Sequence, residues 1–172
     1  MVSANSRSAL QNTYILERSP RTKGLDHNSF DSSPSILESP QKLVVIDPSI
    51  EDHRVRMKQT DPTAKKFLLD PNSDGVEQIT QILYRYSEIT SLHVISSGTS
   101  NQFCLGSTRL SLSNLDCYAW DLQDWCSSFS ATGSGKIILY GCTVVAGGYG
   151  FEFVHRFSQL TGVDVIASST WD

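Results

Sequence analysis

The sequence has no cluster of lysines and arginines, no long apolar run and no apolar core near its N-terminus. Its formal net charge of −4 and pI near 5.5 argue against nucleic acid as a partner. A membrane-spanning helix needs about twenty consecutive apolar residues, so no membrane span is predicted. Residues 1–20 do not resemble a signal peptide. A cytoplasmic location is therefore the default, and export by a signal on a longer parent chain stays open.

Proline is missing after Pro71, and all but one of the glycines lie at or after Gly75. Residues 1–42 are rich in serine, contain Pro20, Pro34 and Pro40, and have few apolar side chains. Such a segment buries too little apolar surface to offset the entropy that ordering costs, so we expect a disordered leader. Residues 43–172 have the composition and length of one α/β domain.

Short apolar runs alternate with helical patterns through this domain. The alternation predicts a mainly parallel sheet with helices on both faces. The predicted strands are 43–47, 66–70, 91–96, 137–141 and 163–167, with a small hairpin at 103–112. The predicted helices are a short one within 50–63, one capped by Asp74, one capped by Ser113 with Cys126 on its apolar stripe, and one from about Phe151 to Gly162.

Three segments match a metal- or cofactor-binding motif only in part. Asp70–Gly75 matches the first half of a calcium loop, but Gln81 stands where that loop needs a bidentate glutamate, so we interpret it as a capped turn. Gly133–Lys136 lacks the first glycine of a phosphate loop and precedes a predicted strand, and Gly147–Gly150 fails the dinucleotide pattern. The four cysteines lack metal-ligand spacing and are interpreted as reduced thiols. We expect no cofactor and no metal.

The stretch KIILYGCTVVAGGYG, residues 136–150, places Cys142 where a predicted strand ends and a loop leads to a helix. Open α/β sheets place ligands and reactive groups at such points. Backbone N–H groups there lower the pKa of a thiol and can hold an oxyanion. A reactive thiol and a small buried side chain both remain open for Cys142.

Several segments resemble a bacterial domain family of unassigned function, often found near the N-terminus of large exported or surface proteins with repeats. The resemblance rests on HVISSG at His93–Gly98 and LYGCTVVAGG at Leu139–Gly148, and extends to LDPNSDGVEQIT, LGSTRLSLSNLDCYAWDLQDW and FVHRFSQLTGVDVIASS. It covers about residues 43–169. The family's fold resembles that of caspases, gingipains and related cysteine peptidases. The chain stops at Asp172, where the family usually continues briefly, so a truncated copy is one interpretation.

The resemblance implies a catalytic arrangement at two strand ends. Cys142 aligns with the nucleophile and Gly98 with the glycine of the oxyanion site, whereas Ser97 stands where the family has its catalytic histidine. His93 lies about 13 Å away along its strand, which favours a packing role. His155, on the helix after the cysteine loop, is interpreted as an exposed residue, with a role near the site as the alternative.

These observations favour a caspase-like domain whose peptidase activity is impaired because Ser97 is no base. The alternative is a non-enzymatic binding or assembly module of a surface protein, with a peptide or protein as partner. A nucleotide-binding domain is a third class, weakened by the missing phosphate loop. Substrate specificity and oligomeric state do not follow from the sequence.

Overall fold

The computed structural model describes residues 42–99, 102–131, 133–141 and 148–168. The predicted leader lies outside these ranges, apart from Lys42, which is the first residue of the first strand. Within the described ranges, no helix combines the length and the hydropathy that crossing a membrane requires. The helices and strands described below lie between Lys42 and Ser168.

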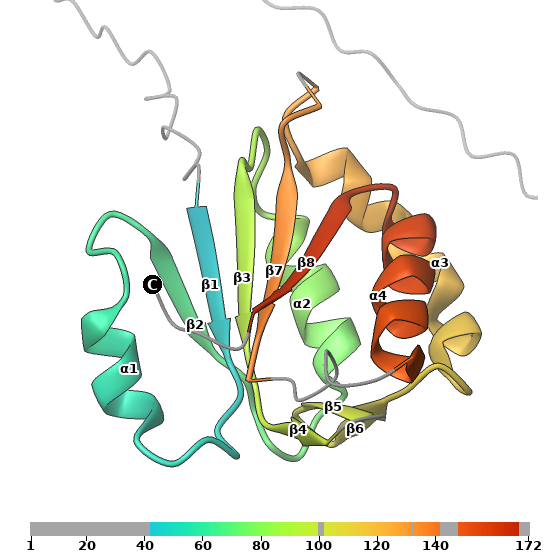
Figure 1. Cartoon of the computed structure of the whole chain (residues 1–172). Helices are drawn as coiled ribbons and strands as arrows, with labels where there is room; N and C mark the ends of the chain where they lie inside the picture. The colour runs from blue at the N-terminus through green and yellow to red at the C-terminus, as the bar shows by residue number, and fades with distance from the viewer. Residues whose placement is uncertain (1–41, 100–101, 132, 142–147, 169–172) are drawn as a thin grey trace, which may run out of the picture. The chain divides into compact units, whose positions relative to one another are not determined.

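Five strands form one parallel sheet in the order β2-β1-β3-β7-β8 (Figure 1). Strand β1 (Lys42–Ile46) pairs with the edge strand β2 (Lys65–Leu68) on one side and with the central strand β3 (Ser91–Ile95) on the other. Beyond β3 lie β7 (Lys136–Tyr140) and the edge strand β8 (Asp164–Ser168). Parallel strands are buried on both faces, which fits their near-continuous apolar runs. All five predicted strands are confirmed, with ends shifted by one or two residues.

A second, smaller sheet follows β3 directly. It is antiparallel and contains β4 (Gly98–Thr99), β5 (Gln102–Leu105) and β6 (Thr108–Leu110). The hairpin predicted at 103–112 is the β5–β6 pair, and it turns at Gly106, whose φ of +57° favours glycine. A Cβ at Gly106 would lie 2.4 Å from the backbone oxygen of Ser73, so the turn also fits tightly against the segment before α2.

Helices cover both faces of the parallel sheet, as predicted. The short helix α1 (His53–Gln59) packs on one face, whereas α2 (Gly75–Leu83), α3 (Ala119–Trp125) and α4 (Gly148–Thr161) pack on the other (Figure 1). The three-helix face holds the larger hydrophobic cluster, to which the strands contribute Leu43, Val45, Leu92, Val94, Ile137 and Leu139. The α1 face holds a smaller cluster of Val44, Ile46, Ala64, Ile95 and Tyr140.

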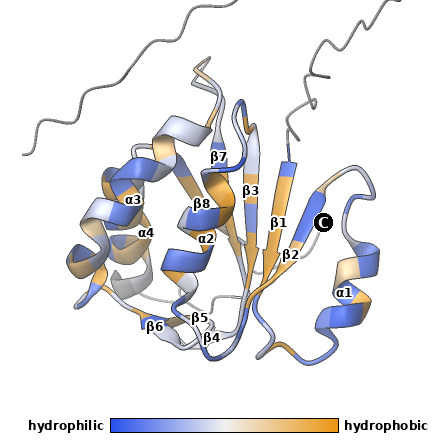
Figure 2. Ribbon diagram, turned by 180° about the vertical axis from the view of Figure 1, so that it is seen from behind, coloured by the Kyte–Doolittle hydropathy of each residue, from blue (hydrophilic) through white to orange (hydrophobic). Residues whose placement is uncertain are grey.

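The two faces differ in how completely they are covered. No residue of α1 is fully buried, whereas α2 buries five of its nine residues. In Figure 2, α1 is largely hydrophilic and lies beside strands such as β1 that are mostly hydrophobic. The α1 face of the sheet is therefore the more open face among the described residues.

Asp74 joins α2 to the segments that pack beside it. Its Oδ1 accepts the backbone N–H groups of Val76 and Glu77 at 2.9 and 3.1 Å, which caps the helix as predicted. Its Oδ2 accepts the hydroxyl groups of Thr108 at 2.6 Å and Tyr118 at 2.9 Å. Partial burial works to raise the pKa of Asp74, but these hydrogen bonds together hold the pKa below its ordinary value. The carboxylate therefore ties α2, β6 and the segment before α3 into one unit.

Replacing Asp74 with alanine should lower the free energy of unfolding by roughly 2 kcal/mol at pH 7, because a helix cap is lost and two hydroxyl groups lose their acceptor. Urea unfolding would measure this. The difference should shrink below about pH 4, since a carboxylate with a lowered folded-state pKa stabilises only while it is ionised. Glu77→Ala in the same helical turn is the matched control, with an expected change below about 0.5 kcal/mol. Equal effects of the two substitutions would contradict this role for Asp74.

The start of the third helical segment differs from the prediction. Ser113 was expected to cap an α-helix, but the segment opens with the 3₁₀-helix η1 (Leu115–Tyr118), preceded by Asn114. The Asn114 side chain accepts the backbone N–H of Ser111 at 2.8 Å, so it closes the preceding turn instead of capping the helix. The prediction of a Ser113 cap was therefore wrong.

The prediction that Cys126 lies on the apolar stripe of this helix was also wrong. The α-helix ends at Trp125, and Cys126 begins the 3₁₀-helix η2 (Cys126–Ser128), with an exposed side chain. The 3₁₀ geometry turns successive residues further around the axis than an α-helix does. Leu115, Leu122, Trp125 and Phe129 are buried in the core, whereas Cys126 between them is not.

The last helix is confirmed, but it begins earlier than predicted. Gly148 already belongs to α4, three residues before the expected start at Phe151. Glycine has low helix propensity, so a glycine-rich first turn gives a weak start signal. Gly162 ends the helix as predicted, with φ +66° and a backbone hydrogen bond of 2.9 Å to the carbonyl of Ser158.

Candidate functional site

The candidate site lies where β3 and β7 end. The two strands are adjacent and parallel, with Ile95 paired to Tyr140, and the N–H of Ser96 donates to the Tyr140 carbonyl at 3.2 Å. Ser97 and Gly98 therefore follow the end of β3 at the edge of the sheet where β7 also ends. The two strand ends that the resemblance singles out therefore belong to neighbouring strands.

Ser97 is held by hydrogen bonds on both its side chain and its backbone. Its Oγ lies 2.6 Å from the Oγ of Ser49, in the segment between β1 and α1. Its carbonyl accepts the N–H of Cys104 at 3.0 Å and the hydroxyl of Ser96 at 2.9 Å. A serine hydroxyl in this setting donates or accepts a hydrogen bond but does not take up a proton near neutral pH. Ser97 therefore fixes the loop end without providing a base.

Gly98 occupies a position that has no room for a side chain. It pairs with Phe103 as part of β4, and an added Cβ would lie 2.6 Å from the backbone oxygen of Gln102. The turn out of β3 into the small sheet therefore requires glycine here. Packing alone accounts for glycine at this position, whether or not its backbone also takes part in chemistry.

Cys142 lies outside the described residues, which stop on this side at Gly141. Gly141 has a φ of +80°, so the chain leaves β7 through a conformation that favours glycine. Cys142 follows directly in the sequence. Its proximity to Ser97 stays a prediction, supported by the pairing of β3 with β7 up to Tyr140.

Asp47 and Ser49 belong to this edge, and sequence reasoning did not identify them. The Asp47 carboxylate is buried and accepts the N–H of Ser49 at 2.8 Å and the N–H of Gly106 at 2.5 Å. It thereby fixes both the loop after β1, which carries Ser49 to Ser97, and the turn of the β5–β6 hairpin. The sequence shows that Asp47 ends a buried strand. It does not show the hydrogen-bond partners of Asp47, because Ser49 is 2 residues away and Gly106 is 59 residues away.

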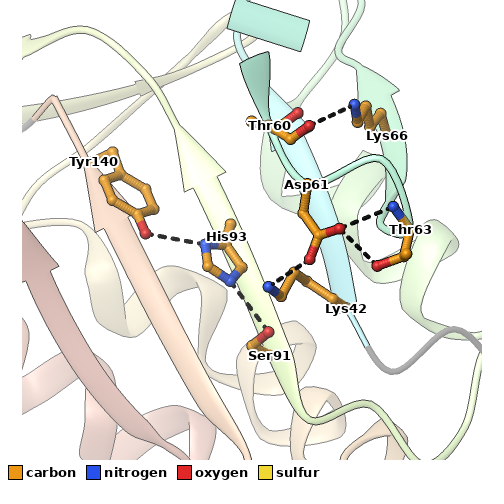
Figure 3. A network of polar contacts seen from close by, with 8 residues as sticks. All are labelled: Lys42, Thr60, Asp61, Thr63, Lys66, Ser91, His93 and Tyr140. Atoms are coloured by element: carbon orange, nitrogen blue, oxygen red, sulfur yellow. Dashed lines mark hydrogen bonds and ion pairs between the residues drawn. The ribbon is translucent and has the colours of Figure 1, made fainter. Parts of the chain in front are cut away.

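The two histidines considered as substitutes for the missing base have other surroundings. His93 faces the α1 side of the sheet, where its Nδ1 lies 3.1 Å from the Tyr140 hydroxyl and its Nε2 lies 3.1 Å from the Ser91 hydroxyl (Figure 3). His155 is exposed on α4, stacks on Phe151 and lines a surface pocket with Asp116. The described contacts thus place neither imidazole at Ser97.

The motifs set aside in the sequence have structural roles. The Asp70 carboxylate accepts the N–H of Asn72 at 2.9 Å and a hydroxyl hydrogen bond from Ser73, which makes the segment a turn that leads into α2. The three cysteines within the described ranges are free thiols. Cys104 is buried, and Cys117 and Cys126 are exposed.

No group of three or more potential metal-binding side chains occurs within the described ranges.

The model of one protein family matches most of the chain. No curated protein and no solved structure matches the chain. The model of a family described as "Domain of unknown function (DUF4347)" matches residues 43–171. The matched range includes all of the sheet except the first residue of β1, and both strand ends of the candidate site. Because the match covers most of the chain, the protein belongs to the family of the domain of unknown function DUF4347.

Proposed function

We propose that this domain is related to the caspase-like cysteine peptidases and that its peptidase site is impaired. In this proposal Cys142 stands in the position of the nucleophile, Ser97 in that of the general base, and Gly98 in that of the oxyanion glycine. The observation that carries the proposal is the parallel pairing of β3 with β7, because it brings the segments leading to Ser97 and Cys142 to one edge of the sheet. The resemblance of the two strand-end segments to the peptidases supplies the assignment of roles.

The impairment follows from the chemistry of the residues at this edge. Acyl transfer by a thiol needs a base that generates the thiolate and an acid that protonates the leaving amine. Ser97 and Ser49 form a hydroxyl pair at this edge, and neither hydroxyl performs these tasks near pH 7. The nearest histidine along β3, His93, contacts Tyr140 and Ser91 instead. A slow or inactive peptidase is the expected result.

The second candidate function is binding without catalysis. One observation favours it: the Ser97–Ser49 contact and the buried carboxylate of Asp47 fix the loops at this edge through hydrogen bonds. Loops held on a rigid sheet are suited to recognising a peptide or protein surface. In this reading the site of a peptidase ancestor serves as a docking site in an exported or surface protein.

The geometry of the proposed site can be tested by crosslinking. Ser97→Cys should form a disulfide with Cys142 under mild oxidation, because in-register neighbours on parallel strands have Cα atoms about 4.8 Å apart, within the range that a disulfide spans. The other three cysteines would be replaced by serine or alanine, and circular dichroism would check the fold. Mass spectrometry after proteolysis would identify the bridge.

Ser91→Cys provides the matched control, because Ser91 lies at the opposite end of the same strand. It should give no bridge to Cys142 under the same conditions. A missing bridge for Ser97→Cys in a folded protein, or equal yields for the two variants, would overturn the proposed site.

A further inference from the structure

Charge is unevenly divided along the sequence. Residues 42–66 contain six lysines and arginines against four aspartates and glutamates, whereas residues 67–168 contain four against nine. The first range spans β1, α1 and β2, and the second includes α2, α3 and α4, which pack on the other face of the sheet from α1 (Figure 1). The domain therefore has an excess of positive charge around α1 and an excess of negative charge in the part that contains the other helices.

Helix α1 is cationic and exposes an apolar side chain. Its seven residues, HRVRMKQ, contain three cations and no carboxylate. Arg54 and Lys58 are exposed and lie four residues apart, which puts them on the same side of the helix, and Val55 beside them is 49% exposed. The nearest carboxylates in the sequence before the helix, Glu51 and Asp52, lie at its N-terminal end. The α1 surface, formed by Arg54, Val55 and Lys58, is therefore an apolar group with cations beside it.

Helix α3, on the other face of the sheet, has the opposite character. Its seven residues, AWDLQDW, contain two carboxylates and no cation. Trp120 is 85% exposed, and Asp124 lies one helical turn further along the same side. The Asp124 carboxylate accepts the hydroxyl of Tyr84, an exposed residue that follows α2, at 2.8 Å. That hydrogen bond raises the pKa of Tyr84 most, and the nearby charges of Asp124 and Asp121 add to the increase. Trp120 and Tyr84 therefore form, with these two carboxylates, an aromatic and acidic α3 surface.

The α1 and α3 surfaces complement each other. Each has an apolar group with charges of one sign beside it, and the two signs are opposite. Tryptophan is enriched among the residues that contribute most to protein interfaces, and the face of its indole attracts cations. The two carboxylates of the α3 surface are three residues apart and the two cations of the α1 surface are four apart, so each pair is spaced by about one helical turn. Two ion pairs can therefore form at the same time around one apolar contact.

We propose that the domain associates with a second copy of itself, head to tail, through the α3 surface of one copy and the α1 surface of the next. Trp120 packs on Val55 of the neighbouring copy, and Asp121 and Asp124 pair with the two cations beside that valine. A second copy is favoured over another partner because one chain carries both complementary surfaces. The two surfaces are different and lie on opposite faces of the sheet, so the contact produces open chains or rings instead of two-fold dimers. This inference goes beyond the proposed function and does not rest on it.

The association is weak and depends on salt. Two seven-residue helices make a contact smaller than the roughly 1,200 Å² at which stable interfaces begin, so we expect a Kd on the order of 0.1–1 mM. Its ion pairs are exposed, and salt screens exposed charges over a distance of about 3 Å at 1 M against about 30 Å at 0.01 M. Raising the salt concentration across this range should therefore weaken the association at least roughly fivefold.

The test uses the full chain with a reducing agent, which prevents disulfides between the exposed cysteines Cys117 and Cys126. In low salt, sedimentation velocity should show an average mass that rises with protein concentration up to about 1 mM. In NMR spectra over the same range, the indole N–H signal of Trp120 should shift, while that of Trp125, which is buried, stays unchanged. Trp120→Ala should weaken the association at least roughly fivefold, because it removes the apolar centre of the α3 surface.

Charge reversal identifies the two surfaces independently. The double variant Arg54→Glu with Lys58→Glu makes both surfaces acidic, and Asp121→Lys with Asp124→Lys makes both basic. Each variant alone should be monomeric at about 1 mM, whereas an equimolar mixture of the two should associate at least as strongly as the unmodified chain, because each acidic surface then finds a basic one. Circular dichroism would check that both variants fold.

Lys65→Glu with Lys136→Glu is the matched control, because it changes the net charge as much as the α1 double variant but at exposed positions on β2 and β7. It should associate like the unmodified chain. Three results would overturn the inference: a chain that stays monomeric at about 1 mM in low salt, association that neither double variant weakens, or a mixture of the two variants that stays monomeric. A monomeric chain whose Trp120 signal shifts with a tetra-arginine peptide would assign the α3 surface to a basic segment of another protein instead.

Discussion

Replacing Ser97 with histidine should raise the alkylation rate of Cys142 at pH 6 by roughly tenfold. An unperturbed thiol with a pKa near 8.5 is only about 0.3% thiolate at pH 6. A neighbouring imidazolium that lowers this pKa by about two units raises the thiolate fraction by somewhat less than a hundredfold. The lower intrinsic nucleophilicity of a more acidic thiol removes part of the gain, which leaves about a tenfold increase.

The measurement is iodoacetamide labelling between pH 5 and 9, with mass spectrometry to assign each site. Cys117 and Cys126 are exposed and provide internal reference rates in the same sample. Ser97→Ala is the control variant, because it removes the contact with Ser49 without adding an imidazole. Labelling of Cys142 in that variant should follow the unmodified chain.

Three outcomes would contradict the proposal of an impaired site. An unchanged rate in a folded Ser97→His protein would mean that the two positions are not neighbours in a usable geometry. A Cys142 thiolate that is already reactive below about pH 7 in the unmodified chain would mean that another group supplies the base, with His155 the first residue to test. Turnover of a peptide pool by the unmodified chain would have the same meaning.

Replacing Trp125 with alanine should lower the free energy of unfolding by about 3–5 kcal/mol. Trp125 is only 1% exposed, and its indole N–H donates to the Thr80 hydroxyl of α2 at 2.8 Å. Its ring meets that of Phe157 on α4 edge to face, with centroids 5.8 Å apart. The Trp125 side chain thus joins α2, α3 and α4 on the face of the sheet that holds the larger hydrophobic cluster. Its removal leaves a cavity, and the buried Thr80 hydroxyl loses its indole donor.

Trp120 provides the matched control on the same helix, because its side chain is 85% exposed. Trp120→Ala should change the free energy of unfolding by less than about 0.5 kcal/mol. For a domain of this size, the melting temperature of Trp125→Ala should fall on the order of 10–20 °C, while that of Trp120→Ala stays nearly constant. Similar melting temperatures for the two variants would show that Trp125 does not join the helices as described.

The parallel sheet was predictable because its signals are local and strong. β1, β3 and β7 are short apolar runs bounded by turn residues, and each was identified to within one or two residues. The start of α2 was equally clear, because Asp74 is a favoured cap and apolar residues follow at helical spacing. In these segments, the preference of the residues for strand or helix agrees with the burial that the fold requires.

The features that sequence reasoning missed depend on contacts between distant segments. β4 contains only Gly98 and Thr99, so no periodic pattern is long enough to indicate a strand. Asn114 bonds back to Ser111 rather than capping a helix, and this choice between two local hydrogen-bonding partners is not visible in composition. The helix that follows is α-helical for only seven residues, so helical spacing misplaced Cys126.

The candidate site was predictable where it depends on local sequence patterns, and not where it depends on contacts between distant segments. The family resemblance placed Ser97 and Cys142 after two strand ends, and β3 and β7, the strands that lead to them, are neighbours in the sheet. The support from Asp47 and Ser49 was not predictable, because it depends on where the loop after β1 folds back.

The strand order also has a consequence for how the chain reaches its native state. Every pairing in the parallel sheet joins segments far apart in sequence, such as Leu43 with Lys65 in β1–β2 and Leu43 with Leu92 in β1–β3. Chains dominated by such non-local contacts fold more slowly than helical bundles of similar size. During synthesis β1 emerges first, but β3, its partner on the side of the candidate site, emerges much later. The apolar run of β1 therefore remains unpaired on that side early in folding, when aggregation competes most strongly with folding.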